Sequence, residues 1–234
     1  MRSRTLICIV GPDGVGKTTH ARLLVKAYRN NGIRSDYVWM RFHHILSLPL
    51  LALARRSGLT EIQRYTNGRK AVYHNFGRVK PFAMAYRWLL LVDTLIAIMI
   101  KVYPKVALGS TVVCDRFVYD TLVDLIISTN DTKVLRYFTT RLFLSLASKS
   151  KAVVMIADPE ALKARREDVL HDRNLNLRME LYKSLSIRFG LPVVWASGSI
   201  CEVHDVLLKT LGLGLRFRAP MKACRLPQQL IEKG

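Results

Sequence analysis

The chain has 234 residues, a length that suits one large domain or one domain with a decorated edge. Half of the residues are hydrophobic, a share that allows a sizeable core and excludes intrinsic disorder. Lys and Arg number 37 against 17 Asp and Glu, and the net charge of +20 favours polyanionic partners: nucleic acid, nucleotide phosphates or an anionic membrane.

The predicted strands are short, apolar and bounded by Gly, Pro, Asp or Ser, as buried parallel strands are. They cover residues 5–10, 36–40, 111–114, 152–157 and 192–196. Helical patterns lie between them, over residues 16–30, 81–106, 131–147, 159–170 and 174–188. This alternation predicts an α/β fold with right-handed crossovers and a parallel sheet covered by helices on both faces. Residues from Leu215 onward have no clear period and indicate an extension.

Membrane insertion and export are not expected. The most apolar run, residues 88–100, has 13 residues and contains Asp93, whereas a helix needs about 20 apolar residues to span a bilayer. We expect this run to be a helix buried in the core. The amino terminus, MRSRTLICIVGPDG, has too short an apolar stretch for a secretory signal.

Cysteine usage indicates the compartment. The four cysteines show no paired metal-ligand spacing and are too few for a disulfide scaffold. Two of them, Cys8 and Cys114, fall within predicted strands and are expected to be small apolar core residues. We therefore expect a reducing, cytoplasmic location.

The strongest motif is GPDGVGKT at residues 11–18, which fits GxxxxGK[ST] at every fixed position and lies between a buried strand and an amphipathic helix. Its glycines let successive N–H groups point inward around a phosphate, and the helix amino terminus adds positive potential there. Lys17 can reach the β- and γ-phosphates of ATP, and the Thr18 hydroxyl can ligate Mg²⁺. The residues expected to bind ATP are Gly11, Pro12, Asp13, Gly14, Val15, Gly16, Lys17, Thr18 and Thr19.

A second motif is Asp115-Arg116, which closes the strand VVC. A carboxylate at a strand end beside the loop can hold Mg²⁺ together with Thr18, and the adjacent arginine can bind a second phosphate. Thr18 and Asp115 are therefore the candidate metal ligands.

A basic cluster occurs in the predicted helix 159–170 and just after it, in ALKARREDVLHDRN. Arginines on a mobile segment, here Arg165 and Arg166, could close over a transferring phosphoryl group and stabilise its charge. They could equally form a solvated helix face, because Glu167 and Asp168 follow at once. Both interpretations stay open.

The combination of GPDGVGKTT, VVCDRF and DPEALKARRED resembles the thymidylate kinase family of nucleoside-monophosphate kinases over about residues 5–211. The resemblance implies a three-layer P-loop kinase fold, with a five-stranded parallel sheet and helices on both faces. It implies one domain over residues 1–211 with a lid-like segment at about 159–178, followed by a basic extension over 212–234. It also implies transfer of the γ-phosphoryl group of Mg·ATP to a nucleoside monophosphate.

The resemblance also implies roles for single residues. Asp13 matches an acidic loop residue that contacts the acceptor sugar, Arg116 matches an arginine that contacts the acceptor phosphate, and Arg41 matches one placed near the transferred group. The expected catalytic residues are Lys17, Arg41, Arg116, Arg165 and Arg166. The expected acceptor-binding residues are Asp13, Arg41, Arg116 and Asp120.

The acceptor half departs from the family pattern. Phe42-His43-His44 replaces Glu-Pro-Gly-Gly, Asp93-Thr94 replaces an Asp-Arg pair, and Asp120 and Leu125 replace residues near the base. The string DRFVYDTLVDL resembles instead a divergent thymidylate kinase-like branch. Asp120 and Asp124 lie four apart on one helical face, where they could accept sugar hydroxyls or cap the helix. We expect conversion of dTMP to dTDP, with a nucleoside, sugar or lipid-linked alcohol as the alternative acceptor.

Two further partners stay open. Segment 55–80 has seven Lys and Arg against Glu61, with Tyr65, Tyr73 and Phe76 interleaved as base stacking would need. Because no nucleic-acid module is recognisable, a nucleic-acid-binding NTPase is the weaker alternative. The apolar helix 88–100 could also pack against a second copy in a homodimer.

Overall fold

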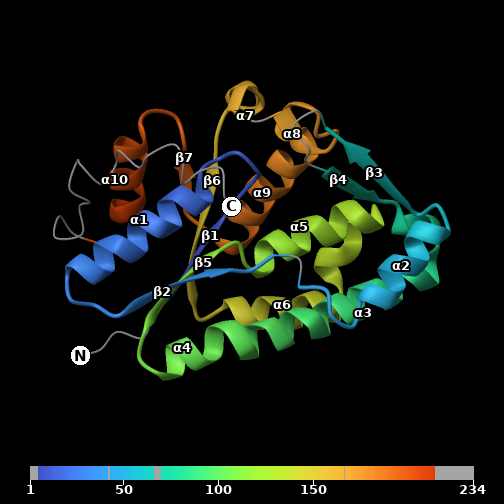
Figure 1. Cartoon of the computed structure of the whole chain (residues 1–234), viewed down its shortest axis with the longest axis horizontal. Coiled ribbons are helices and arrows are strands. Elements are labelled where there is room, and N and C mark those ends of the chain that lie inside the picture. Colours follow the sequence, from blue (N-terminus) through green and yellow to red (C-terminus); the bar gives the residue numbers. More distant parts are fainter. Residues whose placement is uncertain (1–4, 42, 66–69, 166, 214–234) are drawn as a thin grey trace.

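Residues 5–41, 43–65, 70–165 and 167–213 are described by the structure, a computed structural model (Figure 1). Five strands form one parallel sheet in the order β2-β5-β1-β6-β7. They are β1 (Leu6–Val10), β2 (Ser35–Trp39), β5 (Thr111–Asp115), β6 (Ser150–Ile156) and β7 (Val193–Trp195). Every strand begins and ends within two residues of its predicted bounds, so the α/β prediction with a five-stranded parallel sheet is confirmed.

The register of the sheet places two chain segments side by side at its carboxyl edge. Cys8 pairs with Cys114 on one side of β1 and with Ala152 on the other, and all three are buried. Ile9 pairs with Asp115 at the end of β5. The loop after β1 and the Asp115-Arg116 pair therefore leave the sheet side by side, at the edge where open parallel sheets bind ligands.

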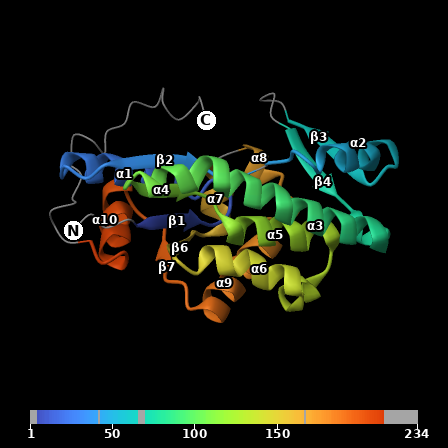
Figure 2. The same ribbon diagram turned by 90° about the horizontal axis from the view of Figure 1, so that it is seen from below.

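Helices cover both faces of the sheet (Figures 1 and 2). On one face α1 (Lys17–Asn30) packs against β1, β2 and β5, and α10 (Ile200–Thr210) packs against α1 and β7. The other face carries α5 (Val118–Thr129), α6 (Phe138–Ala147), α9 (Leu175–Phe189) and the long helix described next. Two short helices, α7 (Pro159–Arg165) and α8 (Glu167–Leu170), lie over the glycine-rich loop, since Leu162 and Val169 are the neighbours of Gly14.

The apolar run 88–100 lies within a long helix whose extent agrees with the helical pattern predicted over residues 81–106. That helix comprises α3 (Lys80–Ala97), a π-helical turn η2 (Ile98–Val102) and α4 (Tyr103–Ala107). The expectation of a helix buried in the core is wrong for one of its sides: Leu90 and Leu91 are buried, but Trp88 is 46% and Ile100 66% exposed. Within the described ranges, Lys80–Ala107 is the one helix whose length and composition would allow it to cross a membrane.

A smaller unit without a sequence prediction lies at one end of the molecule (Figure 1). It consists of α2 (Leu48–Arg56), the antiparallel hairpin of β3 (Thr60–Arg64) and β4 (Lys70–His74), and the short η1 (Phe76–Arg78). Its buried residues, among them Leu51 and Phe76, form a second hydrophobic cluster with Phe82 and Tyr86 of α3.

Two predicted helices are interrupted. Residues 131–147 form η3 (Thr132–Arg136) and then α6, with Tyr137 in an extended conformation between these two helices. Asp131 accepts hydrogen bonds from Lys133 N and from the Tyr137 hydroxyl, and these contacts stabilise the break. Residues 159–170 form α7 and α8 rather than one helix. The predicted extension lies almost wholly outside the described residues, which end at Leu213.

Candidate functional site

The glycine-rich loop between β1 and α1 has a backbone that other residues could not adopt. Gly11, Gly14 and Gly16 have φ angles of 145°, 81° and 94°. A Cβ on Gly11 would lie 2.1 Å from the carbonyl oxygen of Met155. Gly16 is the N-cap of α1, whose first turn carries no acidic residue and no side-chain cap. The backbone N–H groups at this helix end give the loop the positive potential of an anion-binding site.

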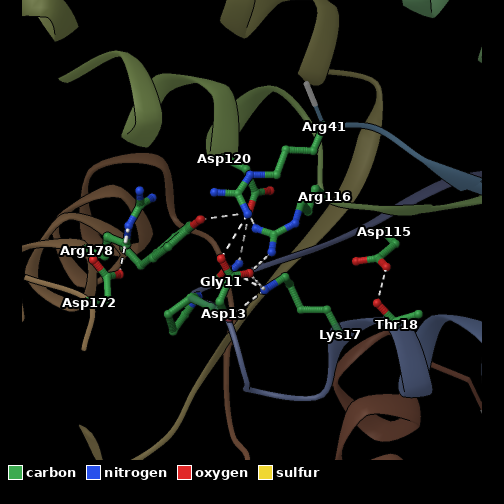
Figure 3. A network of polar contacts seen from close by, with 12 residues as sticks. Gly11, Asp13, Lys17, Thr18, Arg41, Asp115, Arg116, Asp120, Asp172 and Arg178 are labelled. Carbon is green, nitrogen blue, oxygen red and sulfur yellow. Dashed lines mark hydrogen bonds and ion pairs between the residues drawn. The ribbon is translucent and has the colours of Figure 1, made fainter. Parts of the chain in front are cut away.

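Lys17 fills the inside of this loop (Figure 3). Its side chain is only 4% exposed, and Nζ donates hydrogen bonds to the carbonyl oxygens of Gly11 at 2.7 Å and Pro12 at 2.5 Å. A buried ammonium group therefore lies inside the glycine-rich loop, at the start of α1. Phosphate oxygens are the ligands that such a combination of donors and charge would bind.

Thr18 and Asp115 form the second predicted part of the site. Thr18 Oγ1 donates a hydrogen bond of 2.5 Å to Asp115 Oδ2, and the Tyr37 hydroxyl donates to the same oxygen at 2.9 Å. Asp115 Oδ1 is buried and accepts no hydrogen bond from the part of the chain that the structure describes. An orphaned carboxylate oxygen beside a hydroxyl fits a hard divalent cation.

Such a cation would need further ligands from outside the protein. The described residues hold no group of three or more His, Cys, Asp or Glu side chains able to bind a metal ion. Mg²⁺ commonly keeps several waters and takes its remaining ligands from substrate phosphates. The pair of Thr18 and Asp115 therefore fits Mg²⁺ bound together with a nucleotide.

Two arginines meet the loop carboxylate at the same edge of the sheet (Figure 3). Arg41 follows β2, and its NH1 lies 2.9 Å from Asp13 Oδ2. Arg116 follows β5, and its NH2 forms an ion pair with Asp13 Oδ1. Arg116 has a φ of 69°, a rare conformation for a residue with a side chain, which its N–H bond to the Ile9 carbonyl holds in place. The three side chains expected to contact the acceptor are thus brought together.

Asp120, the fourth expected acceptor ligand, is engaged inside the protein. It is 1% exposed, its Oδ2 accepts the Phe117 N–H at 2.9 Å, and its Oδ1 accepts the Tyr182 hydroxyl at 2.7 Å. Arg116 NH1 and the Gly11 N–H lie 3.4 Å from the same Oδ1. Of the two interpretations of Asp120, the capping of α5 is the one that the geometry shows.

Asp124 joins Arg41 to an arginine that the sequence had not singled out. Asp124 Oδ2 lies 3.2 Å from Arg41 Nε and Oδ1 lies 2.5 Å from Arg178 NH1. Arg178 Nε also lies 3.4 Å from Asp172. Burial alone would raise the pKa of Asp124, but the two guanidinium groups outweigh it and hold that pKa well below its usual range. Arg178 lies at the end of the lid-like segment 159–178 and so extends the basic site.

Arg165 of the predicted helix 159–170 does not join this cluster. Arg165 NH2 donates to the carbonyl oxygen of Ala196, just beyond β7, at 3.1 Å. Arg166, also expected to be catalytic, lies outside the described residues. Within α7, Lys163 pairs with Glu160 at 2.7 Å. The structure therefore places Arg165 beside the loop region without a contact to Arg41 or Arg116.

The aromatic residues of segment 55–80 are occupied by other parts of the protein. Tyr65 stacks on His171 with ring centroids 5.8 Å apart, the Arg173 guanidinium lies 4.7 Å from the Tyr73 ring centroid, and Phe76 is fully buried. The expected platform for base stacking is therefore not open at these three positions.

Asp93 also has an internal role. It is fully buried and accepts hydrogen bonds from Leu46 N at 2.7 Å, Ser47 N at 3.0 Å and Ser47 Oγ at 2.6 Å. Burial opposes its ionisation, but these hydrogen bonds prevail and lower the pKa of Asp93. Asp93 thus fixes the start of α2 against α3.

No family model matches the chain, and no curated protein is significantly similar to it in sequence. What the site does must therefore be inferred from its own geometry and chemistry.

Proposed function

We propose that this protein is a Mg²⁺-dependent phosphotransferase with a P-loop kinase fold, which moves the γ-phosphoryl group of ATP to a nucleoside monophosphate, with dTMP as the leading acceptor. One observation carries the proposal: Lys17 and the pair Thr18–Asp115 share one sheet edge with Arg41 and Arg116. Two anion-binding groups with a cation site beside them match the needs of phosphoryl transfer between two phosphorylated molecules.

The donor phosphates would lie in the glycine-rich loop. Lys17 Nζ would exchange the carbonyl oxygens of Gly11 and Pro12 for β- and γ-phosphate oxygens, which carry far more negative charge. When bound, Mg²⁺ supplies charge neutralisation, and Thr18 and Asp115 would hold it. The protein contributes alignment and electrostatic stabilisation, so the reaction needs no covalent nucleophile.

The acceptor phosphate would bind Arg41 and Arg116 in place of the Asp13 carboxylate that now bridges them. An oxygen of that phosphate attacks the γ-phosphorus, and the bond from this phosphorus to the β–γ bridging oxygen breaks to release ADP. Displaced from the arginines, Asp13 becomes available to a sugar hydroxyl. Two arginines at this position favour a phosphorylated acceptor over a nucleoside or a free alcohol, which would give them no anion.

The decisive experiment measures ADP release by the full chain with Mg·ATP and a panel of acceptors. The panel holds dTMP, the other nucleoside monophosphates, nucleosides, phosphorylated sugars and a lipid-linked alcohol. Lys17→Ala should lower turnover roughly 10²-fold or more, as loss of a charge-stabilising donor does. Lys26→Ala, exposed on the same helix, is the matched control and should have normal turnover.

Three results would count against the proposal in different ways. Full activity in Lys17→Ala would show that the glycine-rich loop is not the binding site of the phosphate donor. Turnover of alcohols but of no nucleoside monophosphate would show that the acceptor is an alcohol and not a nucleoside monophosphate. ATP hydrolysis that rises on addition of DNA or RNA and falls steeply with salt would indicate the nucleic-acid-binding NTPase instead.

A further inference from the structure

The long helix over Lys80–Ala107 has an exposed side that is as apolar as its buried one. Met84, Trp88, Val92, Met99 and Tyr103 recur at intervals of four and seven residues, which places them along one side of the helix. Their exposed fractions range from 37% for Val92 to 59% for Tyr103. We call these five residues, with Ile100 and Leu108 beside them, the α3 face. In Figure 2 this helix runs along much of the length of the molecule on its outer side.

The loop before α2 extends the α3 face. Ile45 and Leu46 are about half exposed, and the Leu46 N–H donates a 2.7 Å hydrogen bond to the buried Asp93 of α3. The apolar surface therefore comprises two chain segments that are fixed to each other. Exposed apolar surface of this extent on a folded protein marks an interaction site.

The charge around the α3 face is almost entirely positive. Between residues 42 and 110 the sequence has ten Lys and Arg and two acidic residues, an excess of eight positive charges. Of these two acidic residues, Asp93 is buried and the exposed Glu61 is paired with Arg173. Asp36 of β2 lies 3.7 Å from Lys105 and neutralises one of the ten positive charges. Lys80 begins the helix and Lys101 lies on its last third, and both are exposed. The apolar surface thus has a cationic rim.

We propose that the α3 face binds the surface of an anionic lipid membrane, with the helix lying in the plane of the headgroups. Apolar side chains would enter the acyl boundary, Trp88 and Tyr103 would lie at headgroup level, and the cationic rim would contact anionic lipid. The net charge of +20 adds to this attraction. The inference goes beyond the proposed reaction and does not depend on it.

Two other occupants fit the observations less well. A second copy packed by two-fold symmetry would bring the cationic rims of both copies together, and Asp36, already paired with Lys105, would neutralise only a small part of that charge. A membrane-spanning arrangement would have to unpack Leu90, Leu91 and Asp93 from the protein, whereas docking at the surface leaves that side of the helix in place.

The test is cosedimentation of the full chain with vesicles of phosphatidylcholine alone, or with one third phosphatidylglycerol. Binding is expected with the anionic vesicles only, and it should weaken as salt screens the rim. The double variant Val92→Glu/Met99→Glu should lower partitioning about tenfold or more. Both side chains are exposed, so the variant should fold, which circular dichroism verifies. Val206→Glu, equally exposed on α10 at another side of the molecule, is the matched control and should bind normally.

A spectroscopic measurement locates the contact. In the double variant Trp39→Phe/Trp195→Phe, Trp88 is the single tryptophan, and its selectively excited emission should shift to the blue with anionic vesicles. Equal binding to both vesicle types, no binding to either, or an equal loss in Val206→Glu would each overturn the proposal. One combined result would also overturn it: the wild type is a dimer in sedimentation velocity and does not bind vesicles, and Val92→Glu/Met99→Glu dissociates this dimer. The α3 face would then bind a second copy of the chain.

Discussion

At the scale of single residues, Asp120 connects three parts of the chain that the site needs in fixed positions. It caps α5 at Phe117, accepts a hydrogen bond from Tyr182 of α9, and lies beside Arg116. Burial, with the Asp120 carboxylate beside it, raises the pKa of Tyr182. Tyr182 therefore stays a neutral donor, and the carboxylate that orients Arg116 keeps its own hydrogen-bond partner.

Removing that donor gives the first structural prediction. Tyr182→Phe should lower the free energy of unfolding by about 2 kcal/mol, because it deletes a buried hydrogen bond to a charged group and leaves the packing intact. Urea denaturation measures this difference. Tyr119→Phe is the matched control on α5. The Tyr119 ring packs against Phe189, and the free energy of unfolding should fall much less in this variant. Equal losses in the two variants would contradict a special role for the Tyr182 hydroxyl.

Residues inside sequence motifs were predictable, and residues that only the fold brings to the site were not. Lys17, Thr18 and Asp115 belong to short patterns whose spacing already implies phosphate and Mg²⁺ chemistry. Arg178 and Tyr182 come from α9, far along the chain, and no local pattern connects them with Asp124 or Asp120. Their spacing of four residues, which places both on one side of a helix, was the only available signal.

At the scale of elements, the β3–β4 hairpin and the segment after α8 contact each other beside the site (Figure 1). Arg173 forms an ion pair with Glu61 of β3 and lies over the ring of Tyr73 in β4. Tyr65 stacks on His171, and the Tyr73 hydroxyl is 3.5 Å from the His171 carbonyl. Contacts between exposed side chains of this kind hold two elements together weakly and are sensitive to salt.

Arg173→Ala should therefore loosen this contact without unfolding the protein. We expect amide hydrogen exchange in β3 and β4 to accelerate several-fold, while the central strands keep their protection. Lys163→Ala is the matched control, because its ion pair with Glu160 lies within α7 and joins no other element. The exchanged pair Glu61→Arg/Arg173→Glu should restore slow exchange; if it does not, the ion pair is not what holds the two elements.

The parallel strands were predictable because each is a short apolar run bounded by turn residues, and burial on both faces demands that pattern. The hairpin was not, because its strands are only partly buried, with Ile62 and Val72 almost half exposed, and polar residues such as Glu61 and Gln63 interrupt their apolar pattern. Helix α2 depends on Ser47, whose backbone and hydroxyl bind Asp93 from a distant helix. That contact joins segments far apart in the sequence, so no local sequence pattern predicts it.

At the scale of the whole molecule, part of the net charge now has a location. Lys17, Arg41, Arg116 and Arg178 line the candidate site, and a further share forms the rim of the α3 face. The tail 212–234 contributes five basic residues against Glu232, a net of +4, but residues 214–234 lie outside the described part. The positive charge is thus divided between the site, one surface and one terminus.

The first and last helices of the described chain are joined by a buried pair of histidines. His20 of α1 stacks on His204 of α10, with ring centroids 5.7 Å apart and planes 14° apart. Within the described residues His20 Nδ1 and both ring nitrogens of His204 have no hydrogen-bond partner. Burial lowers the pKa of His20 to about 3, with smaller contributions from the nearby His204 and Arg165. Burial also lowers the pKa of His204 to about 4, although the negative charge of Asp205 acts in the opposite direction.

These pKa values predict how the stability depends on pH. Between pH 6.5 and about 4 the unfolded chain binds protons at His20 and His204 that the folded protein does not, so the free energy of unfolding should fall as the pH falls. Each histidine contributes at most about 1.4 kcal/mol per pH unit in this window. Burial also lowers the pKa of His43, His44 and His74, which adds to the same trend.

A variant separates the pair from the other histidines. His204→Leu removes one proton site and one of the neighbours that lower the pKa of His20, so its stability should fall less steeply between pH 7 and pH 5 than that of the wild type. Above pH 5 the carboxylates are ionised in both states and contribute little slope. Urea denaturation at several pH values measures the two slopes. Leu208→Ala, a core change in the same helix, should lose stability equally at every pH. Parallel pH curves for wild type and His204→Leu would show that the buried pair does not set the acid sensitivity of the fold.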